Sequence, residues 1–74
     1  MLNAQLITLK ELAKLAGVSV ATINYYTNLG LINIAERKGN IRMYDRQDTM
    51  LKFRKIRSMR KEGYPLMIIK KELS

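Results

Sequence analysis

The first clear pattern in the chain is a helical repeat of apolar side chains close to its start. The repeat has the spacing i, i+3, i+4 and i+7, and its members are Leu9, Leu12, Ala13 and Ala16. This spacing predicts an amphipathic helix over about 8–16 with one buried face. Thr8 and Glu11 form a capping box at its start, and Gly17 can enter the left-handed region at its end without strain.

A second helix follows after a very short turn. Ser19 is a good N-cap residue and Gly30 a good terminator, so the segment between them predicts a helix over about 19–28. Two helices joined by a short turn with glycine are the signature of a helix-turn-helix, here 8–29. Helical hairpins in other bundles share this pattern, so the pattern alone leaves both interpretations open.

Beyond the second helix the apolar spacing changes to alternation. The segments 31–35 and 41–44 alternate between apolar and polar residues, and the segment 36–40 between them contains a Gly-Asn pair. Two extended runs joined by such a turn predict a β-hairpin with a basic tip. A basic hairpin directly after a helix-turn-helix is a wing, which we place at 32–44.

The remaining chain again shows helical spacing. An apolar residue recurs at every third position, at Met50, Phe53, Ile56 and Met59. Asp45 can cap this third helix, 46–62, Gly63 interrupts it, and Pro65 suits the first turn of a fourth helix, 65–73. The predicted fold class is therefore mainly α, a four-helix winged helix-turn-helix with a small two-stranded β-hairpin wing.

Composition limits what such a fold can do. The 74 residues allow one small domain, 1–74, with a core of marginal size. The chain has no cysteine and no histidine, which removes disulfides, thiolate and imidazole chemistry and nearly every zinc site. It also shows no signal peptide and no apolar run near the ~18 residues of a membrane span. We therefore expect a cytoplasmic, nucleoid-associated binding protein that is not an enzyme and uses no metal or cofactor.

Charge divides the chain into two unequal parts. The net charge is +8, yet residues 1–36 are neutral overall because two lysines oppose two glutamates. Residues 37–74 carry twelve lysines and arginines against four carboxylates, so the whole excess lies there. A field of this sign attracts a polyanion, either a nucleic acid or an acidic membrane surface. The second helix contains no charge, which suits base reading, a task separate from phosphate attraction.

One face of the second helix suits the major groove of DNA. The base-facing residues we expect are Ala21, Asn24, Tyr25 and Asn28, and the packing residues are Ile23, Tyr26 and Thr27. Asparagine can bond adenine at N6 and N7, and alanine can pack against a thymine methyl group. A tyrosine hydroxyl can bond a phosphate. Both asparagines also fit the simpler role of solvated helix residues.

The cations after residue 36 suit the phosphate backbone. The residues expected to bind phosphate are Thr22 on the second helix, Arg37, Lys38 and Arg42 on the wing, Arg54, Arg57 and Lys61 on the third helix, and Tyr64 after it. Each basic residue taken alone is usually a solvated surface charge, so the interpretation depends on their number. Neutralising roughly four to six phosphates predicts that log K falls with log salt at a slope of about −4 to −5.

Several short segments together resemble the DNA-binding domain of the mercury-resistance regulator (MerR) family. They are Glu11-Leu12-Ala13, Gly17-Val18-Ser19, Thr22-Ile23-Asn24-Tyr25-Tyr26, Gly30-Leu31-Ile32, Gly39-Asn40-Ile41-Arg42-Met43-Tyr44, Gly63-Tyr64-Pro65-Leu66 and Ile69-Lys70. The resemblance implies a winged helix-turn-helix that binds promoter DNA as a homodimer, next to RNA polymerase, and regulates transcription. It also implies that Thr22, Tyr25, Arg37 and Arg42 contact DNA, and that Tyr44 braces the wing against the core.

The chain departs from the family pattern in three respects. Met50 lies one residue further from Tyr44 than the family pattern has it, which affects where the third helix starts. Asn24 stands where the family commonly has arginine, so an amide replaces a strong contact that is worth about 1–3 kcal/mol. The family also continues into a dimerising coiled coil and an effector-binding domain, and this sequence includes neither. The apolar run 66–69 leaves Met67 and Ile68 partly exposed on the predicted fourth helix, where they could contact another segment or subunit.

Two further functions fit the same sequence. A phage excisionase has a similar small winged design and bends DNA as an architectural or recombination factor, which would give head-to-tail footprints. A protein-interaction module would dock a partner helix on the apolar run 66–69. That module would bind DNA only weakly at physiological salt.

Overall fold

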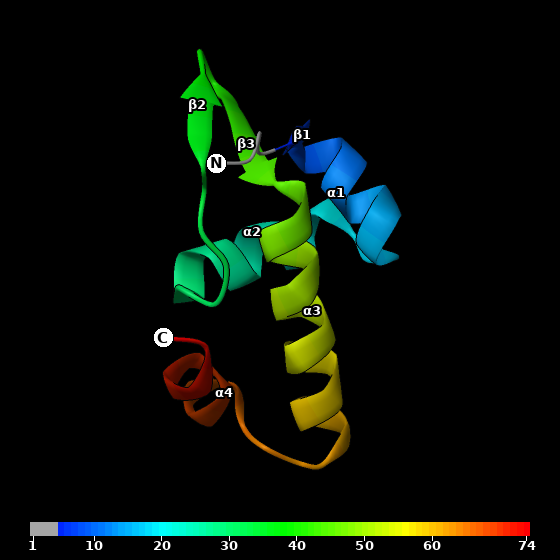
Figure 1. The fold of residues 1–74 in the computed structure, drawn as a ribbon, viewed down its shortest axis with the longest axis vertical. Coiled ribbons are helices and arrows are strands. Elements are labelled where there is room, and N and C mark those ends of the chain that lie inside the picture. The colour runs from blue at the N-terminus through cyan, green and yellow to red at the C-terminus, as the bar shows by residue number, and fades with distance from the viewer. Residues whose placement is uncertain (1–4) are drawn as a thin grey trace.

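Four helices and three short strands make up residues 5–74, the part of the chain that the computed structural model describes (Figure 1). In chain order they are β1 (Leu6–Thr8), α1 (Leu9–Ala16), α2 (Val20–Leu29), β2 (Glu36–Lys38), β3 (Ile41–Asp45), α3 (Arg46–Lys61) and α4 (Leu66–Leu73). Each predicted helix is present, and its bounds agree with the prediction to within one residue. The mainly α, winged helix-turn-helix fold is therefore confirmed.

The helix-turn-helix depends on capping groups at the start of each helix. In the capping box, the Thr8 N–H donates to Glu11 Oε1 at 2.8 Å, and the Glu11 N–H donates to Thr8 Oγ1 at 3.1 Å. The α1 helix ends at Gly17, whose φ of 72° lies in the left-handed region that favours glycine. Ser19 then caps α2 by accepting the Thr22 N–H at 3.1 Å. The two helices are thus joined by the short turn that the sequence predicts.

The wing hairpin is present, but its first strand begins later than predicted. We expected 31–35 to be extended, and this expectation is wrong, because the first strand is β2, at Glu36–Lys38. Leu31 and Ile32 are instead buried in the core, each 1% exposed, and an apolar pair that anchors a loop to the core cannot also form an exposed strand. A third strand, β1, pairs with β3 in the order β1-β3-β2, so the sheet has three strands where the sequence predicts two.

A single apolar core connects the helices with the sheet. Its largest fully buried apolar side chains are Leu12 of α1, Ile23 of α2, Leu31 and Ile32 of the following loop, Tyr44 of β3, Ile56 of α3 and Ile69 of α4. From the predicted α3 stripe, Phe53 and Met59 are also buried, whereas Met50 packs at the edge of the core. Figure 1 shows α3 running down the molecule, with α2 crossing it and α4 beside its lower end.

A partly buried pair of hydroxyl groups attaches the wing to α2. Tyr44 of β3 is fully buried, and its hydroxyl oxygen lies 2.8 Å from Thr27 Oγ1 of α2. The Thr27 hydroxyl donates to the Ile23 carbonyl oxygen at 2.7 Å, so its single hydrogen is used and Tyr44 is the donor between the two hydroxyls. The expectation that Tyr44 braces the wing against the core is confirmed.

The Tyr44→Phe variant tests this attachment. Phenylalanine keeps the buried ring but removes the donor to Thr27, and such a hydrogen bond contributes about 0.5–1.5 kcal/mol net. We expect the free energy of unfolding to fall by about 1 kcal/mol, which lowers the melting temperature of a domain of this size by about 4–8 °C. Melting curves recorded by circular dichroism measure this change. Tyr64→Phe alters a tyrosine that is 44% exposed and should melt like the wild type, so an equal loss in both variants would contradict the assignment.

Candidate nucleic-acid interface

The α2 helix has two distinct faces, as its sequence predicts. The packing face contains the buried Ile23 with the partly buried Tyr26 and Thr27, and the outer face contains Ala21, Asn24, Tyr25 and Asn28. On the outer face, Asn24 is partly buried and the other three residues are exposed. Tyr25 is 54% exposed, and its ring centroid lies 6.0 Å from that of Tyr26. The outer face is therefore available to a ligand, with Asn24 at its border with the rest of the protein.

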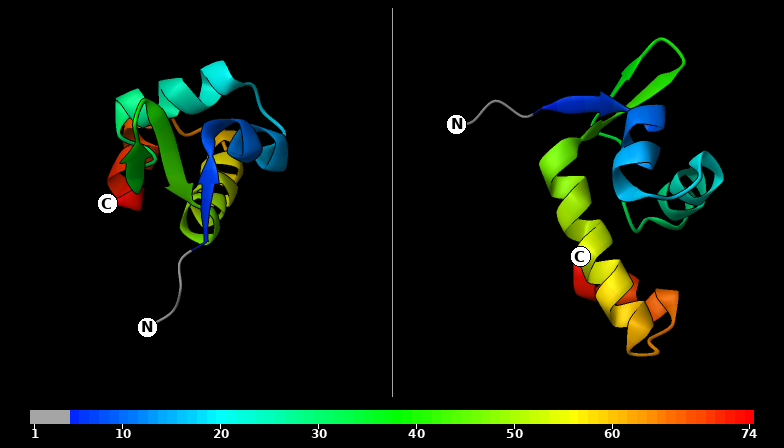
Figure 2. Two further views of the ribbon diagram at one scale, coloured as in Figure 1. Left: turned by 90° about the horizontal axis from the view of Figure 1, so that it is seen from above. Right: turned by 90° about the vertical axis from the view of Figure 1, so that its right-hand side faces the viewer.

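An open groove of about 790 Å³ lies between α2 and the wing. It is lined by Thr8, Leu9 and Lys10 at the start of α1, Asn24 and Asn28 of α2, and Asn40, Ile41 and Arg42 of the wing. Figure 2 shows α2 and the tip of the hairpin on the same side of the molecule. Of the predicted base-facing residues, Asn24 and Asn28 line this α2–wing groove, whereas Ala21 and Tyr25 lie on the outer face beyond its lining.

A hydrogen bond between side chains crosses the α2–wing groove. Arg42 Nη1 donates to Asn24 Oδ1 at 3.0 Å, in a partly buried position. Arg42 and Tyr44 are alternate residues of β3 and so point to the same face of the sheet, while Asn24 and Thr27 lie one turn apart on α2. The structure thus joins two predicted DNA contacts into a pair. Their binding to a base and to a phosphate stays a prediction.

The wing concentrates positive charge on the face that carries Arg42. Arg37 of β2 is the cross-strand partner of Arg42, whereas Lys38 is the partner of Ile41. Side chains directly opposite each other on paired strands lie on the same face of the sheet, and like charges in this arrangement destabilise a hairpin. A phosphate bound between the two arginines would relieve the repulsion. The arrangement therefore favours an anionic ligand.

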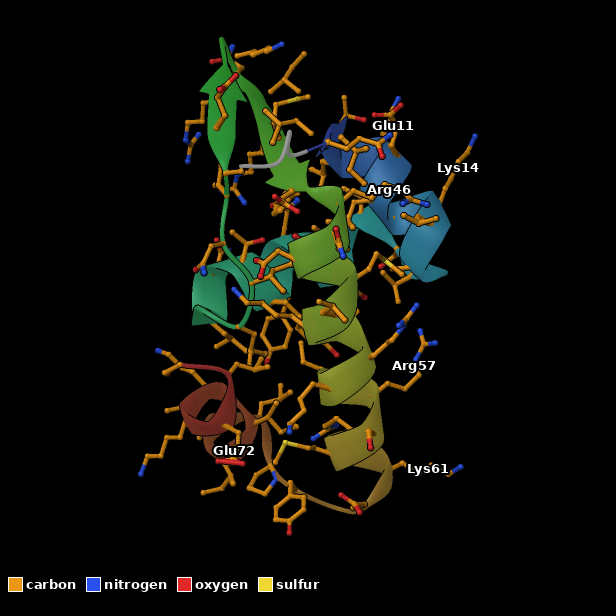
Figure 3. The ribbon with its side chains drawn as sticks, viewed as in Figure 1. Glu11, Lys14, Arg46, Arg57, Lys61 and Glu72 are labelled. Atoms are coloured by element: carbon orange, nitrogen blue, oxygen red, sulfur yellow. The ribbon has the colours of Figure 1, made fainter. Side chains whose placement is uncertain are left out.

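The predicted cations of α3 lie on a different part of the surface. A second groove is lined by residues that include Arg54, Arg57 and Lys61 of α3 together with Leu15 and Ala16 of α1. Figure 3 shows Arg57 and Lys61 pointing to the same side of the molecule as Lys14. Arg57 Nη2 also donates to the Ala16 carbonyl oxygen at 3.0 Å, at the end of α1, where a cation is favourable. Arg57 thus has a structural partner, and phosphate binding by the three α3 cations stays a prediction.

Two further predicted phosphate contacts lie at helix ends. Thr22 is in the first turn of α2, where its hydroxyl oxygen is 3.0 Å from Ser19 Oγ. The backbone N–H groups of a first helical turn attract anions. Tyr64 follows the end of α3 and is 44% exposed. Both positions are open to a ligand, and their contacts with phosphate stay predictions.

Five residues that line the α2–wing groove were not predicted to contact DNA. They are Thr8, Leu9 and Lys10 at the start of α1, and Asn40 and Ile41 of the wing. Lys10 comes close to the wing because β1, directly before α1, pairs with β3 and places Thr8 opposite Met43. The sequence signal for β1 was the run 6–8, and a run of this length is too short for alternation of apolar and polar residues to predict a strand.

The family of the chain follows from comparison with known proteins. The family model described as MerR HTH family regulatory protein matches residues 7–74. The chain belongs to this family. The resemblance found in the sequence is confirmed. The predicted class of function, DNA binding in the regulation of transcription, is confirmed with it.

Curated relatives of this MerR-family chain are considerably longer than the chain itself. Nodulation protein NolA of Bradyrhizobium diazoefficiens is 39% identical over 64 residues, which are 85% of this chain and 27% of NolA. The HTH-type transcriptional regulator CueR of Bacillus subtilis is 49% identical over 43 residues, which are 58% of this chain and 30% of CueR. The chain therefore spans less than a third of either relative. No solved structure matches it at comparable significance.

The wing cations of this MerR-family domain have no acidic partners within residues 5–74. In that part of the chain the one ion pair joins Lys52 to Asp48 at 3.2 Å, one turn apart on α3. Because the wing cations have no acidic partner there, their positive charge is available to a ligand.

Residues 5–74 also contain no group of acidic or other ligand side chains that could hold a metal ion. None of the helices in this part of the chain has the length and apolar character needed to cross a membrane.

The Arg37→Thr variant separates the stability of the wing from DNA binding. It removes the like-charge pair with Arg42, so we expect the free domain to become more stable by about 0.2–1 kcal/mol. It also removes a predicted phosphate contact, so duplex binding should weaken, and the slope of log K against log salt should become shallower by about 0.9. Melting curves measure the first effect, and fluorescence anisotropy titrations at several salt concentrations measure the second.

Lys38→Thr is the matched control for this experiment. It removes the same charge from the same strand, but Lys38 faces Ile41 rather than a cation. We expect it to weaken duplex binding without raising stability. If both variants change the melting temperature equally, repulsion between Arg37 and Arg42 does not act in the free wing.

Proposed function

We propose that this chain binds double-stranded DNA sequence-specifically, as the DNA-reading domain of a MerR-type transcription regulator. The observation that carries the proposal is the uncharged outer face of α2 beside a cationic hairpin on one side of the molecule (Figure 2). Short polar side chains read base edges, whereas cations attract phosphates. In this proposal α2 enters the major groove and the wing follows the backbone. The chain acts by binding alone, without catalysis and without a cofactor.

The size and spacing of α2 support this placement. A helix with its side chains is about 10–12 Å across, and the major groove of B-DNA is about 12 Å wide. Asn24 and Asn28 are four residues apart, so they project from the same side of the helix, about one turn apart. Both line the groove that opens toward the wing. Base contacts by these two residues, with Ala21 and Tyr25 beside them, are therefore sterically compatible with a helix lying in the major groove.

Selection of duplexes from a random pool tests the proposed function directly. The chain is used to enrich a duplex, and the affinity for that duplex is then titrated over a range of salt concentrations. We expect enrichment of a defined sequence and a slope of log K against log salt of about −4 to −5, since roughly four to six phosphates are neutralised. A chain that binds no duplex at micromolar concentration in low salt would contradict the proposal.

The Tyr25→Ala variant tests the outer face of α2. Tyr25 is 54% exposed, so its removal should leave the fold and the melting temperature nearly unchanged. A hydrogen bond to a charged group contributes about 1.5–3 kcal/mol, so loss of a phosphate contact should weaken binding of the selected duplex at least tenfold. Anisotropy titration measures the affinity, and circular dichroism checks the fold.

Leu51→Ala is the matched control for Tyr25→Ala. Leu51 lies on α3 and is also 54% exposed, but it belongs to neither the outer face of α2 nor the wing. We expect its removal to leave DNA affinity unchanged. Equal losses in the two variants would show that exposed apolar surface in general, and not the α2 face, determines the affinity.

We further propose that the full-length protein binds a promoter site as a homodimer in the cytoplasm and acts on RNA polymerase there. Support comes from family membership and from relatives of which the matched segment is less than a third. A dimer with one reading helix in each subunit requires two half-sites about 34–36 Å apart. Footprints that show a two-fold-symmetric site would support the regulator, whereas head-to-tail repeats would indicate an excisionase-like factor. A supershift of the protein–DNA complex by RNA polymerase holoenzyme tests the proposed action on RNA polymerase.

A further inference from the structure

The hydrogen bond between Arg42 and Asn24 determines which atoms of Asn24 are free to meet a base. A guanidinium group has five N–H donors and no acceptor. The Asn24 atom that lies 3.0 Å from Arg42 Nη1 is therefore the amide oxygen, which is the only acceptor in that side chain. The amide nitrogen, with two N–H donors, lies on the other branch of the amide. The orientation of this amide thus follows from the chemistry of its partner.

The pair presents mainly donors to the α2–wing groove. Arg42 retains its other N–H groups, and Asn24 retains both N–H groups of its amide. The positive charge of Arg42 also polarises the amide, which strengthens these donors in a partly buried position. Both residues line the groove. A base edge that enters beside them therefore meets a donor-rich surface with little acceptor capacity.

We propose that Asn24 and Arg42 act as one donor unit that prefers guanine, an inference that rests on the proposed DNA binding. In the major groove guanine presents two acceptors, N7 and O6, whereas adenine presents the acceptor N7 beside the donor N6. A free asparagine matches adenine, because it offers one donor and one acceptor. An asparagine whose oxygen is bonded to arginine matches two acceptors better. The wing thereby changes the base preference of a residue on α2.

The selected duplex, with single-base replacements, tests the donor unit. Each guanine in turn is replaced by adenine or by 7-deazaguanine, which lacks the N7 acceptor, and the chain is titrated by anisotropy. We expect one position at which either replacement weakens binding by the wild type at least tenfold. At that position the guanine-over-adenine ratio should fall to near one in Asn24→Ala, and to one or below in Arg42→Ala, because loss of Arg42 frees the Asn24 oxygen and a free asparagine matches adenine. The double variant should lose no more than either single variant, because the two residues act together.

Arg37→Ala is the matched control for the donor unit. Arg37 is the cross-strand partner of Arg42 and carries the same charge, so its loss should weaken all duplexes equally and leave the guanine-over-adenine ratio unchanged. Asn24→Ala introduces the best helix-forming residue on α2, so this variant folds even if Arg42→Ala does not, and circular dichroism verifies this.

Two results would overturn the donor unit while leaving sequence-specific binding intact. One is that the wild type binds adenine more tightly than guanine at every base pair where Asn24→Ala changes the affinity. The other is that the guanine-over-adenine ratio falls in the double variant by the product of the two single-variant losses. Such a product indicates two independent contacts. Failure to select any duplex would overturn this inference together with the proposed function, and so differs from both results.

Discussion

The position of the wing relative to α2 depends on the two side chains that β3 sends toward that helix. The fully buried Tyr44 donates to the partly buried Thr27, and Arg42 donates to Asn24 at the partly buried border. Because they are alternate residues of one strand, a single register places both bonds. A slip of one residue would turn both side chains to the opposite face of the sheet. The strand therefore sets the geometry of the α2–wing groove and the chemistry of its lining together.

The domain keeps unfavourable features where an external ligand can compensate for them. Its net stability is of the order of a few kcal/mol, at about 0.05–0.15 kcal/mol per residue. Even so, Arg37 and Arg42 stand opposite each other in the hairpin. On α4, Met67 is 62% exposed and Ile68 is 40% exposed, as the sequence predicts. The repulsion on the wing is consistent with a site for phosphate, because an anion converts two opposed charges into two attractions.

Local signals determined the helices and the two faces of α2. Capping groups act over three residues, as the Thr8–Glu11 pair does, and the glycine at position 17 permits the positive φ that ends α1. Helical periodicity likewise separates the buried Ile23 from the exposed Tyr25. These effects depend on neighbours in the chain, so the sequence alone predicted the helix bounds, the outer face and the basic character of the hairpin.

Only the tertiary structure decided how these elements meet. Asn24 and Arg42 are separated by 18 positions, and Ala16 and Arg57 by 41, so no local pattern pairs them. The strand β1 and the placement of Lys10 in the groove depend on pairing with β3, and the true start of β2 depends on burial of Leu31 and Ile32. Periodicity specifies which face of an element is apolar, but the element that covers that face is selected by packing of the whole core.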